Sequence, residues 1–474
     1  MIGVTEEFEG IELGDARLSQ RAVKIAGRLA AEPDKSFPKM TSDGSELEAL
    51  YRFLNNDRVK PELVLAGHYE ATAARAASED QVLVIHDTTG FSFGGETRRK
   101  GLGRMKKASA HHSQGFYWHA ALVASADAGV PLGLIGMKSI FRTAPPTRYP
   151  DRHSERFGVA REFQRWPKLV EETSARLVDC RAIHVMDREA DAYALFCKLT
   201  EKDADFVIRS KDDRILDVPR GDEKQPRLLH DAIEQGRYVT SREVALSTKR
   251  PDKLARLRKA PGRMMRLAQL ELVVTQVSIR HPSYTGGKSR RVSTLPRAIP
   301  LNVVHVYEAN APHGQQPVDW LLLTTLPVKT AKQAEFVVDC YRRRWLIEEY
   351  FKALKTGCAF EKRQLESKHA LLNALALFAP IAWRLLTLRN LGREAPDTPA
   401  SPLLSLRQLQ ILRARAKVSL SRKPTIREAM LAIAAEGGHI KNNGDPGWIV
   451  LGRGYEKLLH MELGFEVAME LQKK

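Results

Sequence analysis

Three acidic residues stand where metal-dependent chemistry could be built. Asp87 closes the apolar run QVLVIHD, Asp187 closes RAIHVMD, and Glu348 lies in the basic segment YRRRWLIEEYFKALKTG, residues 341–357. The two apolar runs are rich in β-branched residues, which predicts strands, and ligands of open α/β sheets usually bind beyond the carboxyl ends of the strands. Carboxylates without cysteine or histidine partners favour hard cations such as Mg²⁺ or Mn²⁺. We therefore predict a metal site at these acids.

A metal site of this kind suits phosphodiester cleavage or transfer, because it can activate water or a hydroxyl and stabilise the leaving oxygen. Taken alone, an aspartate at a strand end is more often a turn former or a helix cap. Neighbouring acids also compete for the two roles, since Glu189 and Asp191 lie near Asp187, and Glu349 adjoins Glu348. We prefer Asp187 because it closes the apolar strand, and Glu348 because it shares a face with cations.

The basic segment 341–357 predicts a helix that carries this cationic face. Spacings of three, four and seven residues place four side chains along one side of a helix. They are Tyr341, Arg344, Glu348 and Lys355. An acid flanked by cations indicates a carboxylate that works beside bound phosphates. A solvated, ion-paired helix surface is the alternative interpretation.

The composition favours a polyanionic partner. The 474-residue chain has a formal net charge of +18, and lysine and arginine can neutralise the phosphates of nucleic acid. No segment approaches the roughly 18 consecutive apolar residues of a membrane-spanning helix, and the first residues, MIGVTEEFEG, are acidic rather than signal-like. The four cysteines form no CxxC pair, which fits a reducing cytoplasm. We predict a cytoplasmic protein that does not bind a membrane.

The chain around these residues divides into three regions of different expected secondary structure. Residues 1 to about 75 read as helical, residues from about 80 as α/β, and residues beyond about 375 as mostly helical. Within the α/β part, about 200–328 alternate strand-like runs with basic loops, which predicts a β-rich insertion with a cationic loop at 248–266. The first region also carries a basic stripe at helical spacing, which suits a phosphate backbone or an ordinary solvent face. The stripe is Arg17, Arg21, Lys24 and Arg28.

These motifs resemble the bacterial DDE transposases of the insertion-sequence-four family. Segment 341–357 is similar to the family's Y-x2-R-x3-E-x6-K signature, IHDTT at 85–89 to its first acidic motif, and MDREAD at 186–191 to its second. The likeness continues through LGDARL and GSELEALYRFLNN near the N-terminus, FVIRSK at 206–211 and DWLLLTTLPV at 319–328. It covers most of the chain to about residue 365, and the tail resembles the family only loosely.

The resemblance implies an α/β fold with an RNase H-like catalytic core, interrupted by a β-rich insertion and flanked by helical N-terminal and C-terminal domains. On this pattern residues 1–75 bind transposon-end DNA, and 76–375 form the catalytic domain with the insertion at about 200–328. Residues 376–474 form a helical domain used in dimerisation. The partners implied are double-stranded DNA, both transposon ends and target, and a second copy of the chain.

The resemblance also assigns roles to residues. Asp87, Asp187 and Glu348 would be catalytic and would bind Mg²⁺, for which Mn²⁺ can substitute. Trp320 would stack on a flipped base, while packing in a strand pair is its alternative role. His86 departs from the family pattern, where the closest relative carries an acid before the first aspartate. The remaining residues expected to contact DNA are Tyr341, Arg344, Lys352, Lys355, Arg209, Lys211, Arg17, Arg21, Lys24 and Arg28.

The reaction that the resemblance implies is cut-and-paste transposition. Water attacks first, the freed 3′-hydroxyl makes a hairpin across the end, the hairpin is reopened, and the end joins target DNA. Two other classes stay open. One is a two-metal DNA nuclease without strand transfer, and the other is a catalytically idle DNA-binding repressor derived from a transposase.

Overall fold

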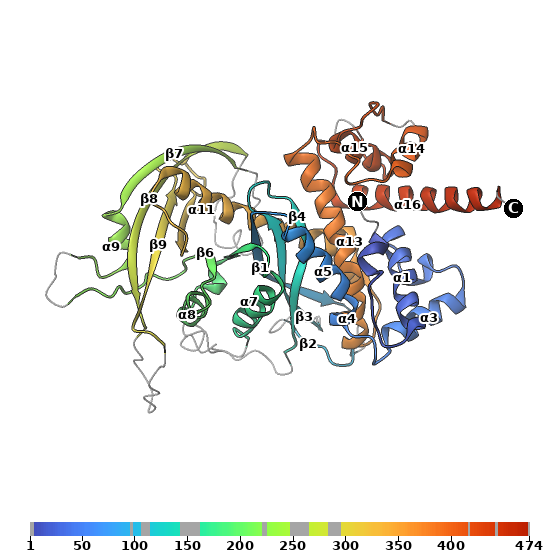
Figure 1. Cartoon of the computed structure of the whole chain (residues 1–474), viewed down its shortest axis with the longest axis horizontal. Helices are drawn as coiled ribbons and strands as arrows, with labels where there is room; N and C mark the ends of the chain where they lie inside the picture. The colour runs from blue at the N-terminus through green and yellow to red at the C-terminus, as the bar shows by residue number, and fades with distance from the viewer. Residues whose placement is uncertain are drawn as a thin grey trace.

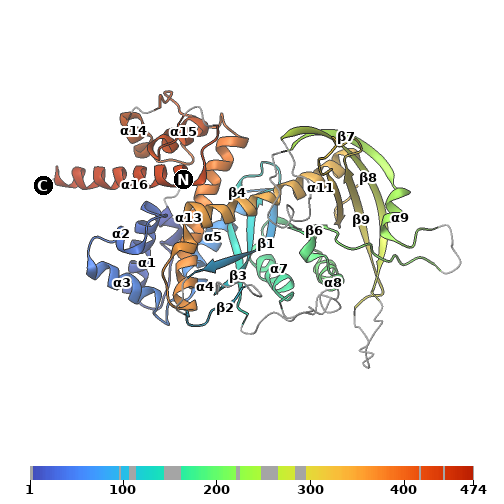
Figure 2. The same cartoon turned by 180° about the vertical axis from the view of Figure 1, so that it is seen from behind.

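The computed structural model describes residues 4–94, 98–105, 114–142, 162–219, 225–246, 265–282, 295–415, 418–440 and 444–472. Its centre is a 10-stranded sheet in the order β2-β3-β1-β5-β6-β10-β9-β8-β7, with β4 paired to β3. Helices cover the sheet, and the N-terminal and C-terminal helices lie together on one side of the molecule (Figure 1). The strands of the curved far end, β7 to β9, lie on the opposite side (Figures 1 and 2).

The half of the sheet nearer the helical termini has RNase H-like topology. β1 pairs antiparallel with β3 and parallel with β5, and β5 pairs parallel with β6. These strands are β1 (Gln81–Phe93), β2 (Gly103–Arg104), β3 (Gln114–Ser125), β4 (Pro131–Ile140), β5 (Arg181–Met186) and β6 (Asp205–Arg209). The predicted fold class, with an RNase H-like core and helical termini, is therefore confirmed.

Helices cover both faces of this half, which explains why β1 begins with a continuous apolar run. Val82 and Val84 join one buried cluster, which includes Leu169 of α7 (Arg165–Arg176). Leu83 and Ile85 join the main core on the other face. Alternate residues of a strand point to opposite faces, so an apolar residue is needed at every position.

The predicted β-rich insertion continues the same sheet. β10 pairs antiparallel with β6, and β9, β8 and β7 follow in turn. Their bounds are β7 (Arg237–Leu246), β8 (Arg266–Arg280), β9 (Ala298–Tyr307) and β10 (Asp319–Thr324). The cationic loop predicted at 248–266 lies almost wholly outside the described residues.

Two expectations about element ends were wrong. β1 does not end at Asp87 but runs to Phe93, because TTGFSF pairs antiparallel with β3 and buries Phe91 and Phe93. Segment 341–357 is not one regular helix either. It spans the end of α11 (Ala331–Arg343), all of α12 (Trp345–Lys352) and a π-helical turn, η3 (Ala353–Gly357).

Two of the N-terminal helices, α1 and α3, are amphipathic and capped by aspartates. In α1 (Ala16–Ala31) the Asp15 side chain accepts from the backbone N–H of Arg17, and Ile25 and Leu29 are buried. The other elements of this region are η1 (Val4–Phe8), α2 (Phe37–Met40), α3 (Gly44–Leu54), α4 (Pro61–Val64) and α5 (Ala66–Ala76). They share one continuous core with the C-terminal helices.

The helix α13 (Lys368–Glu394) forms the centre of that shared core. Among the described residues it is the one helix long and apolar enough to cross a membrane, but 94% of its apolar window is buried inside the protein. A helix that is apolar on all sides is typical of a buried core. The remaining helices are η2 (Arg188–Ala190), α8 (Tyr193–Glu201), α9 (Leu229–Glu234), η4 (Phe360–Lys362), α14 (Leu406–Arg415), α15 (Ile426–Glu436) and α16 (Trp448–Leu471).

Candidate active site

The sheet brings two of the predicted acids to one edge. The parallel ladder between β1 and β5 ends at the pair Ile85 and Val185. Asp87 lies two residues beyond the ladder on β1, and Asp187 directly follows the last residue of β5. The Asp187 carboxylate accepts from the backbone N–H of Glu189 at 2.8 Å, which fixes it as the cap of η2.

Arg344 joins the third acid to the first. This residue lies between α11 and α12, and its guanidinium donates to Asp87 Oδ2 at 3.0 Å and to Glu348 Oε1 at 2.5 Å. Its side chain is only 14% exposed. The acids of β1 and α12 therefore meet across one arginine, in an environment largely shielded from water.

The pKa of Asp87 responds to its burial and to the charged groups around it. Burial raises the pKa of Asp87 to about 7, the nearby Arg344 opposes that rise, and the charges of Asp187 and Glu348 add to it. All three carboxylates are thus close enough to interact. Hard oxygen donors with an excess of negative charge fit a divalent cation such as Mg²⁺ or Mn²⁺.

The acids that competed with these three have other partners. Glu349 binds Lys352 at 2.5 Å and Arg389 of α13. Burial alone would raise the pKa of Glu349, but Lys352 and Arg389 outweigh it and lower that pKa. Glu349 therefore fastens α12 to α13.

The two acids that follow Asp187 are also engaged. Asp191 is fully buried in an ion pair with Arg214 and accepts from the backbone N–H of Lys211 at 2.6 Å. Glu189 pairs with Arg165 at 3.0 Å. Glu189, Asp191 and Glu349 are thus each held in an ion pair, and the choice of Asp187 and Glu348 stays a prediction.

His86, the departure from the family pattern, faces away from Asp87. Successive side chains of a strand point to opposite faces, and His86 is fully buried with its Nε2 2.9 Å from Nδ1 of His184. Burial lowers the pKa of His86 well below its usual value, so the ring is neutral. It contributes to the packing beneath the site rather than to the acid cluster.

The cations predicted to contact DNA divide into two groups around the site. Lys352 is 47% exposed, and Lys211 is exposed as well. Lys355 instead donates to the carbonyl oxygen of Gly90 at 2.7 Å, and Arg209 to that of Asp319 at 2.7 Å. The last two therefore hold the backbone of β1 and β10.

The two predicted aromatic residues contact each other. The rings of Trp320 and Tyr341 meet edge to face with centroids 5.3 Å apart. Tyr341 is buried, and Trp320 is partly buried on β10. Trp320 thus packs against Tyr341 while part of its side chain stays exposed.

Two residues near the acids were missed from the sequence. Trp345 begins α12 three residues before Glu348, is 48% exposed, and lies under the Lys352 ammonium, 4.9 Å from its ring centroid. Arg165 reaches the site from α7 and contacts Thr88. An exposed tryptophan beside a predicted catalytic acid was a usable signal. Arg165 had none, because only the fold brings α7 to these strands.

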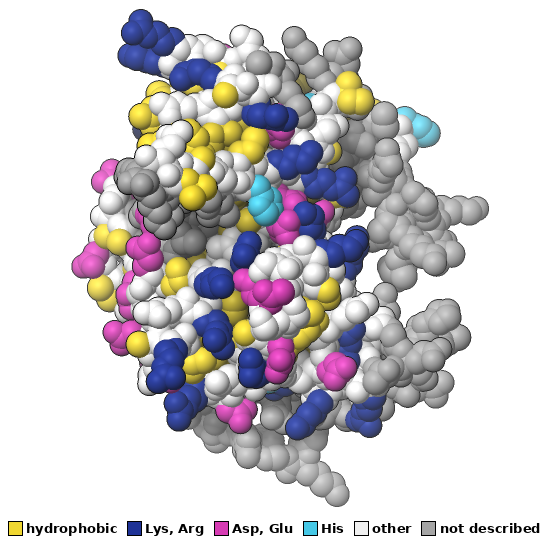
Figure 3. Space-filling view, turned by 90° about the vertical axis from the view of Figure 1, so that its right-hand side faces the viewer, with side chains coloured by type: hydrophobic (Ala, Val, Ile, Leu, Met, Phe, Trp, Pro, Cys, Tyr) yellow, Lys and Arg dark blue, Asp and Glu magenta, His cyan; other side chains and the backbone are white. Residues whose placement is uncertain are grey.

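The basic stripe of α1 lines a cleft of about 660 Å³ between α1 and α3. The cleft is lined by the four predicted cations Arg17, Arg21, Lys24 and Arg28, together with Arg52. Lys and Arg side chains gather on the face of the molecule that carries these helices (Figure 3). Lys24 and Arg28 each approach Glu46 at 3.4 Å, so part of the stripe is neutralised within the protein.

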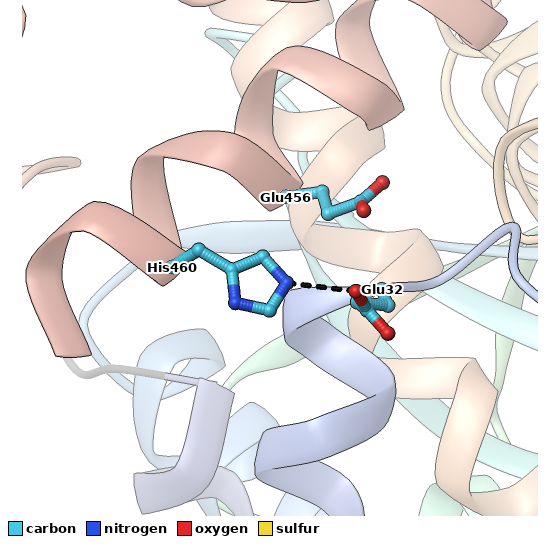
Figure 4. Close-up of side chains that lie close together, drawn as sticks. All are labelled: Glu32, Glu456 and His460. Carbon is cyan, nitrogen blue, oxygen red and sulfur yellow. Dashed lines mark hydrogen bonds and ion pairs between the residues drawn. The ribbon is translucent and has the colours of Figure 1, made fainter. Parts of the chain in front are cut away.

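A separate cluster of two glutamates and a histidine has the spacing of metal ligands, but the ammonium of Lys35 already pairs with both glutamates. Among the described residues, ligand atoms of Glu32, Glu456 and His460 lie within 4.8 Å of one another, whereas Asp87, Asp187 and Glu348 form no such group. Figure 4 shows His460 of α16 directed at Glu32 at the end of α1. The ammonium of Lys35 bonds Glu32 at 2.6 Å and Glu456 at 2.9 Å. This cluster therefore ties α16 to α1 by ion pairs.

Two protein-family models match parts of this chain. A family model described as transposase DNA-binding matches residues 4–59, which include α1 and α3. A second, described as transposase DDE domain, matches residues 158–381, which include Asp187 and Glu348 but begin after Asp87.

One solved structure is described as a cryo-EM structure of the piggyBac transposase synaptic complex with hairpin DNA. It is 10% identical over 92% of this chain and 73% of that chain, with a TM-score of 0.34. A likeness that low supports no inference about this chain. The two domain matches, together with the RNase H-like core, identify the chain as a DDE transposase, a polynucleotidyl transferase and endonuclease that uses divalent metal ions and binds DNA.

Proposed function

We propose that this chain is a cut-and-paste transposase that cleaves transposon ends by Mg²⁺-dependent hydrolysis and transesterification. A hairpin forms during cleavage, and the 3′ ends are then joined to target DNA. The observation that carries the proposal is that Asp87 of β1 and Glu348 of α12 meet across Arg344, while Asp187 follows β5 at the same edge of the sheet, close enough to interact with Asp87.

In this proposal the three carboxylates hold the divalent metal. A bound metal supplies Lewis acidity toward the attacking oxygen and the leaving oxygen of the phosphodiester. The chain's own residues position the DNA. Arg344 and Lys355 lie on the side of the site that includes β1, and exposed Lys352 and Lys211 can reach phosphates at its rim.

Trp320 is assigned the base-stacking role in hairpin formation. A hairpin bends the duplex end sharply, and a base leaving the stack costs a few kcal/mol, while stacking on an aromatic ring returns about 1–3 kcal/mol. The support is the partly exposed indole of Trp320, which is held by Tyr341 beside Arg344.

The proposal places the chain in the insertion-sequence-four family, nearest to the transposase of transposon five. The motifs at 85–89, 186–191 and 341–357 support this branch. It also places the protein in the bacterial cytoplasm, bound to the nucleoid through DNA.

We further propose that the protein acts as a homodimer on two paired ends through its C-terminal region. The last turns of α16 project away from the rest of the molecule in both views (Figures 1 and 2). Phe465 and Met469, four residues apart on this projection, are 44% and 40% exposed. We propose that the two side chains form part of an apolar contact with the second copy.

Two other functions would use the same surfaces. A nuclease would cleave ends without joining them, and a repressor would bind ends without cleaving them. Incubation of the full chain with DNA carrying the flanking inverted repeats and Mg²⁺ separates the three. Nicks, hairpins and joined products are expected, nicks alone would indicate a nuclease, and binding without any cleavage would indicate a repressor.

A further inference from the structure

Arg165, the first residue of α7, makes three hydrogen bonds with one guanidinium. Its Nε donates to Thr88 Oγ1 at 3.1 Å, its Nη2 to Glu189 Oε2 at 3.0 Å, and its Nη1 to the carbonyl oxygen of Glu162 at 2.7 Å. The side chain is only 14% exposed. A guanidinium is planar and holds its donors at fixed spacing, so these three acceptors are held in one geometry.

The two side-chain partners belong to the segments that carry the candidate metal ligands. Thr88 follows Asp87 on β1, and Glu189 follows Asp187 by two residues in η2. The backbone ladder between these strands has already ended at Ile85 and Val185. Beyond that point Arg165 is a side-chain link between the two segments.

The Thr88 hydroxyl also contacts a buried histidine, His119. Thr88 Oγ1 lies 2.9 Å from Nδ1 of His119, whose ring packs against Trp166 with centroids 4.3 Å apart. Since Arg165 Nε can only donate, the Thr88 oxygen accepts from it. The hydroxyl is therefore held between two partners, Arg165 and His119.

The link also works against a repulsion. Asp87 and Asp187 repel each other when both are ionised, and like-charged groups at one sheet edge move apart unless a cation or a rigid support holds them. Arg165 supplies positive charge near Asp187 and itself occupies neither carboxylate.

We propose that Arg165 is a positioning residue that sets the separation of Asp87 and Asp187 for metal binding, through Thr88 and Glu189. The proposal rests on the active site proposed above. It adds a residue from α7 that acts on the metal site only through the two strands.

The test measures Mn²⁺ binding to the full chain by electron paramagnetic resonance, without DNA. Arg165→Gln should weaken Mn²⁺ binding by about tenfold or more, as the loss of groups that orient metal ligands typically does. Arg165→Lys should remain weak, because a lysine is a point charge without a fork. Thr88→Val should reproduce part of the loss, and Thr88→Ser should not.

Two further results decide whether the link is one unit. The double variant Arg165→Gln with Thr88→Val should bind Mn²⁺ no more weakly than Arg165→Gln alone, since residues in one network are not additive. Arg176→Gln is the matched control, because Arg176 lies at the far end of α7 and bonds the Ile135 carbonyl oxygen. It should bind Mn²⁺ as the unchanged chain does.

Unchanged Mn²⁺ affinity in Arg165→Gln, full rescue by Arg165→Lys, or losses that multiply in the double variant would each overturn the proposal. If Arg165→Gln does not fold, as judged by its thermal midpoint, Thr88→Val and Thr88→Ser alone decide between support and refutation. Asp187→Ala tests the active site separately. If it leaves Mn²⁺ binding intact, the proposed site is wrong; if it abolishes binding while Arg165→Gln does not, only the positioning role is wrong.

Discussion

Arg344 lies between two of the acids that are expected to bind the metal ion. Its guanidinium bonds both Asp87 and Glu348. An arginine and a divalent cation that share carboxylates compete for them, and a DNA phosphate would offer Arg344 another partner. DNA binding and metal binding are therefore expected to favour each other.

The first prediction follows from this competition. Without DNA, Arg344→Ala should bind Mn²⁺ several-fold more tightly than the unchanged chain, because a positive charge is removed from between two carboxylates. The same variant should lose most cleavage of DNA ends. Mn²⁺ titration with and without an end fragment measures the first effect, and a cleavage assay on that fragment measures the second. Equal or weaker Mn²⁺ binding by the variant would show that Arg344 supports the acids rather than competing for them.

At the residue scale, the sequence indicates which acids are candidates for the metal site, but it does not show which side chains pair with the neighbouring acids. Strand position and helix face predict Asp187 and Glu348 rather than Asp191 and Glu349, and this assignment stays a prediction. The ion pairs of Asp191 with Arg214 and of Glu349 with Arg389 join residues far apart in the chain. No local pattern encodes such pairs. The roles of the DNA-contacting residues stay predictions.

At the scale of elements, the errors arose where tertiary contacts overrode local signals. TTGFSF contains turn-forming residues, yet β3 offers it a full antiparallel partner, and β1 continues. In the basic segment α11 ends at Arg343 and α12 begins at Trp345, although Arg344 and Glu348 keep a helical i,i+4 contact. The segment ends in the π-helical turn η3, where Lys355 donates to the Gly90 carbonyl oxygen. The sequence predicts the strand and the helical segment, but their ends depend on contacts with β3 and β1 that the sequence does not reveal.

Another element-scale feature is a buried ionic link that fastens η1 to the sheet. Glu7 bonds His68 of α5 and Arg75, and it is 1% exposed. His68 Nε2 accepts from the backbone N–H of Leu134 at 3.0 Å, so Nδ1 carries the proton toward Glu7 and the ring is neutral. Burial would raise the pKa of Glu7, but the bonds from His68 and Arg75 outweigh it and lower that pKa to about 2.

The second prediction is the pH dependence of this link. The pKa of Glu7 is lower in the folded state, so its contribution to stability is complete above about pH 4.5 and is lost as the pH falls toward 2. The difference in unfolding free energy between the unchanged chain and Glu7→Gln should shrink by about 1.4 kcal/mol between neutral pH and pH 3.5. Urea unfolding across that range measures it. Glu9→Gln, at an exposed position next to η1, should show a smaller change, and a constant difference for Glu7→Gln would contradict the assignment.

At the scale of the whole molecule, one continuous core unites the N-terminal helices, the sheet and the C-terminal helices. The sequence predicted helical ends around an α/β centre, but not that α16 would pack on α1 through the cluster of Lys35, Glu32 and Glu456. That contact joins residues more than 400 positions apart, which periodicity cannot reveal. α1, which carries the basic stripe, and α16 are therefore joined by direct contacts.

The third prediction concerns the projecting end of α16. If two copies pair there, the double variant Phe465→Ser with Met469→Ser should bind single DNA ends normally but fail to pair two of them, because the apolar contact is lost. Light scattering of complexes with short end fragments reports the number of chains and DNAs. Gln472→Ala is the control near the same helix end. Paired ends that persist in the double variant would place the dimer interface elsewhere.

The most direct test of the account is metal-dependent cleavage by variants of the three acids. Asp87→Asn, Asp187→Asn and Glu348→Gln should each lower end cleavage by about three orders of magnitude or more while end binding stays largely unchanged, because only the metal site is lost. Glu349→Gln, the neighbour that pairs with Lys352 and Arg389, should keep most cleavage. Full cleavage by Glu348→Gln, or equal losses in Glu348→Gln and Glu349→Gln, would contradict the assignment of Asp87, Asp187 and Glu348 as the catalytic acids.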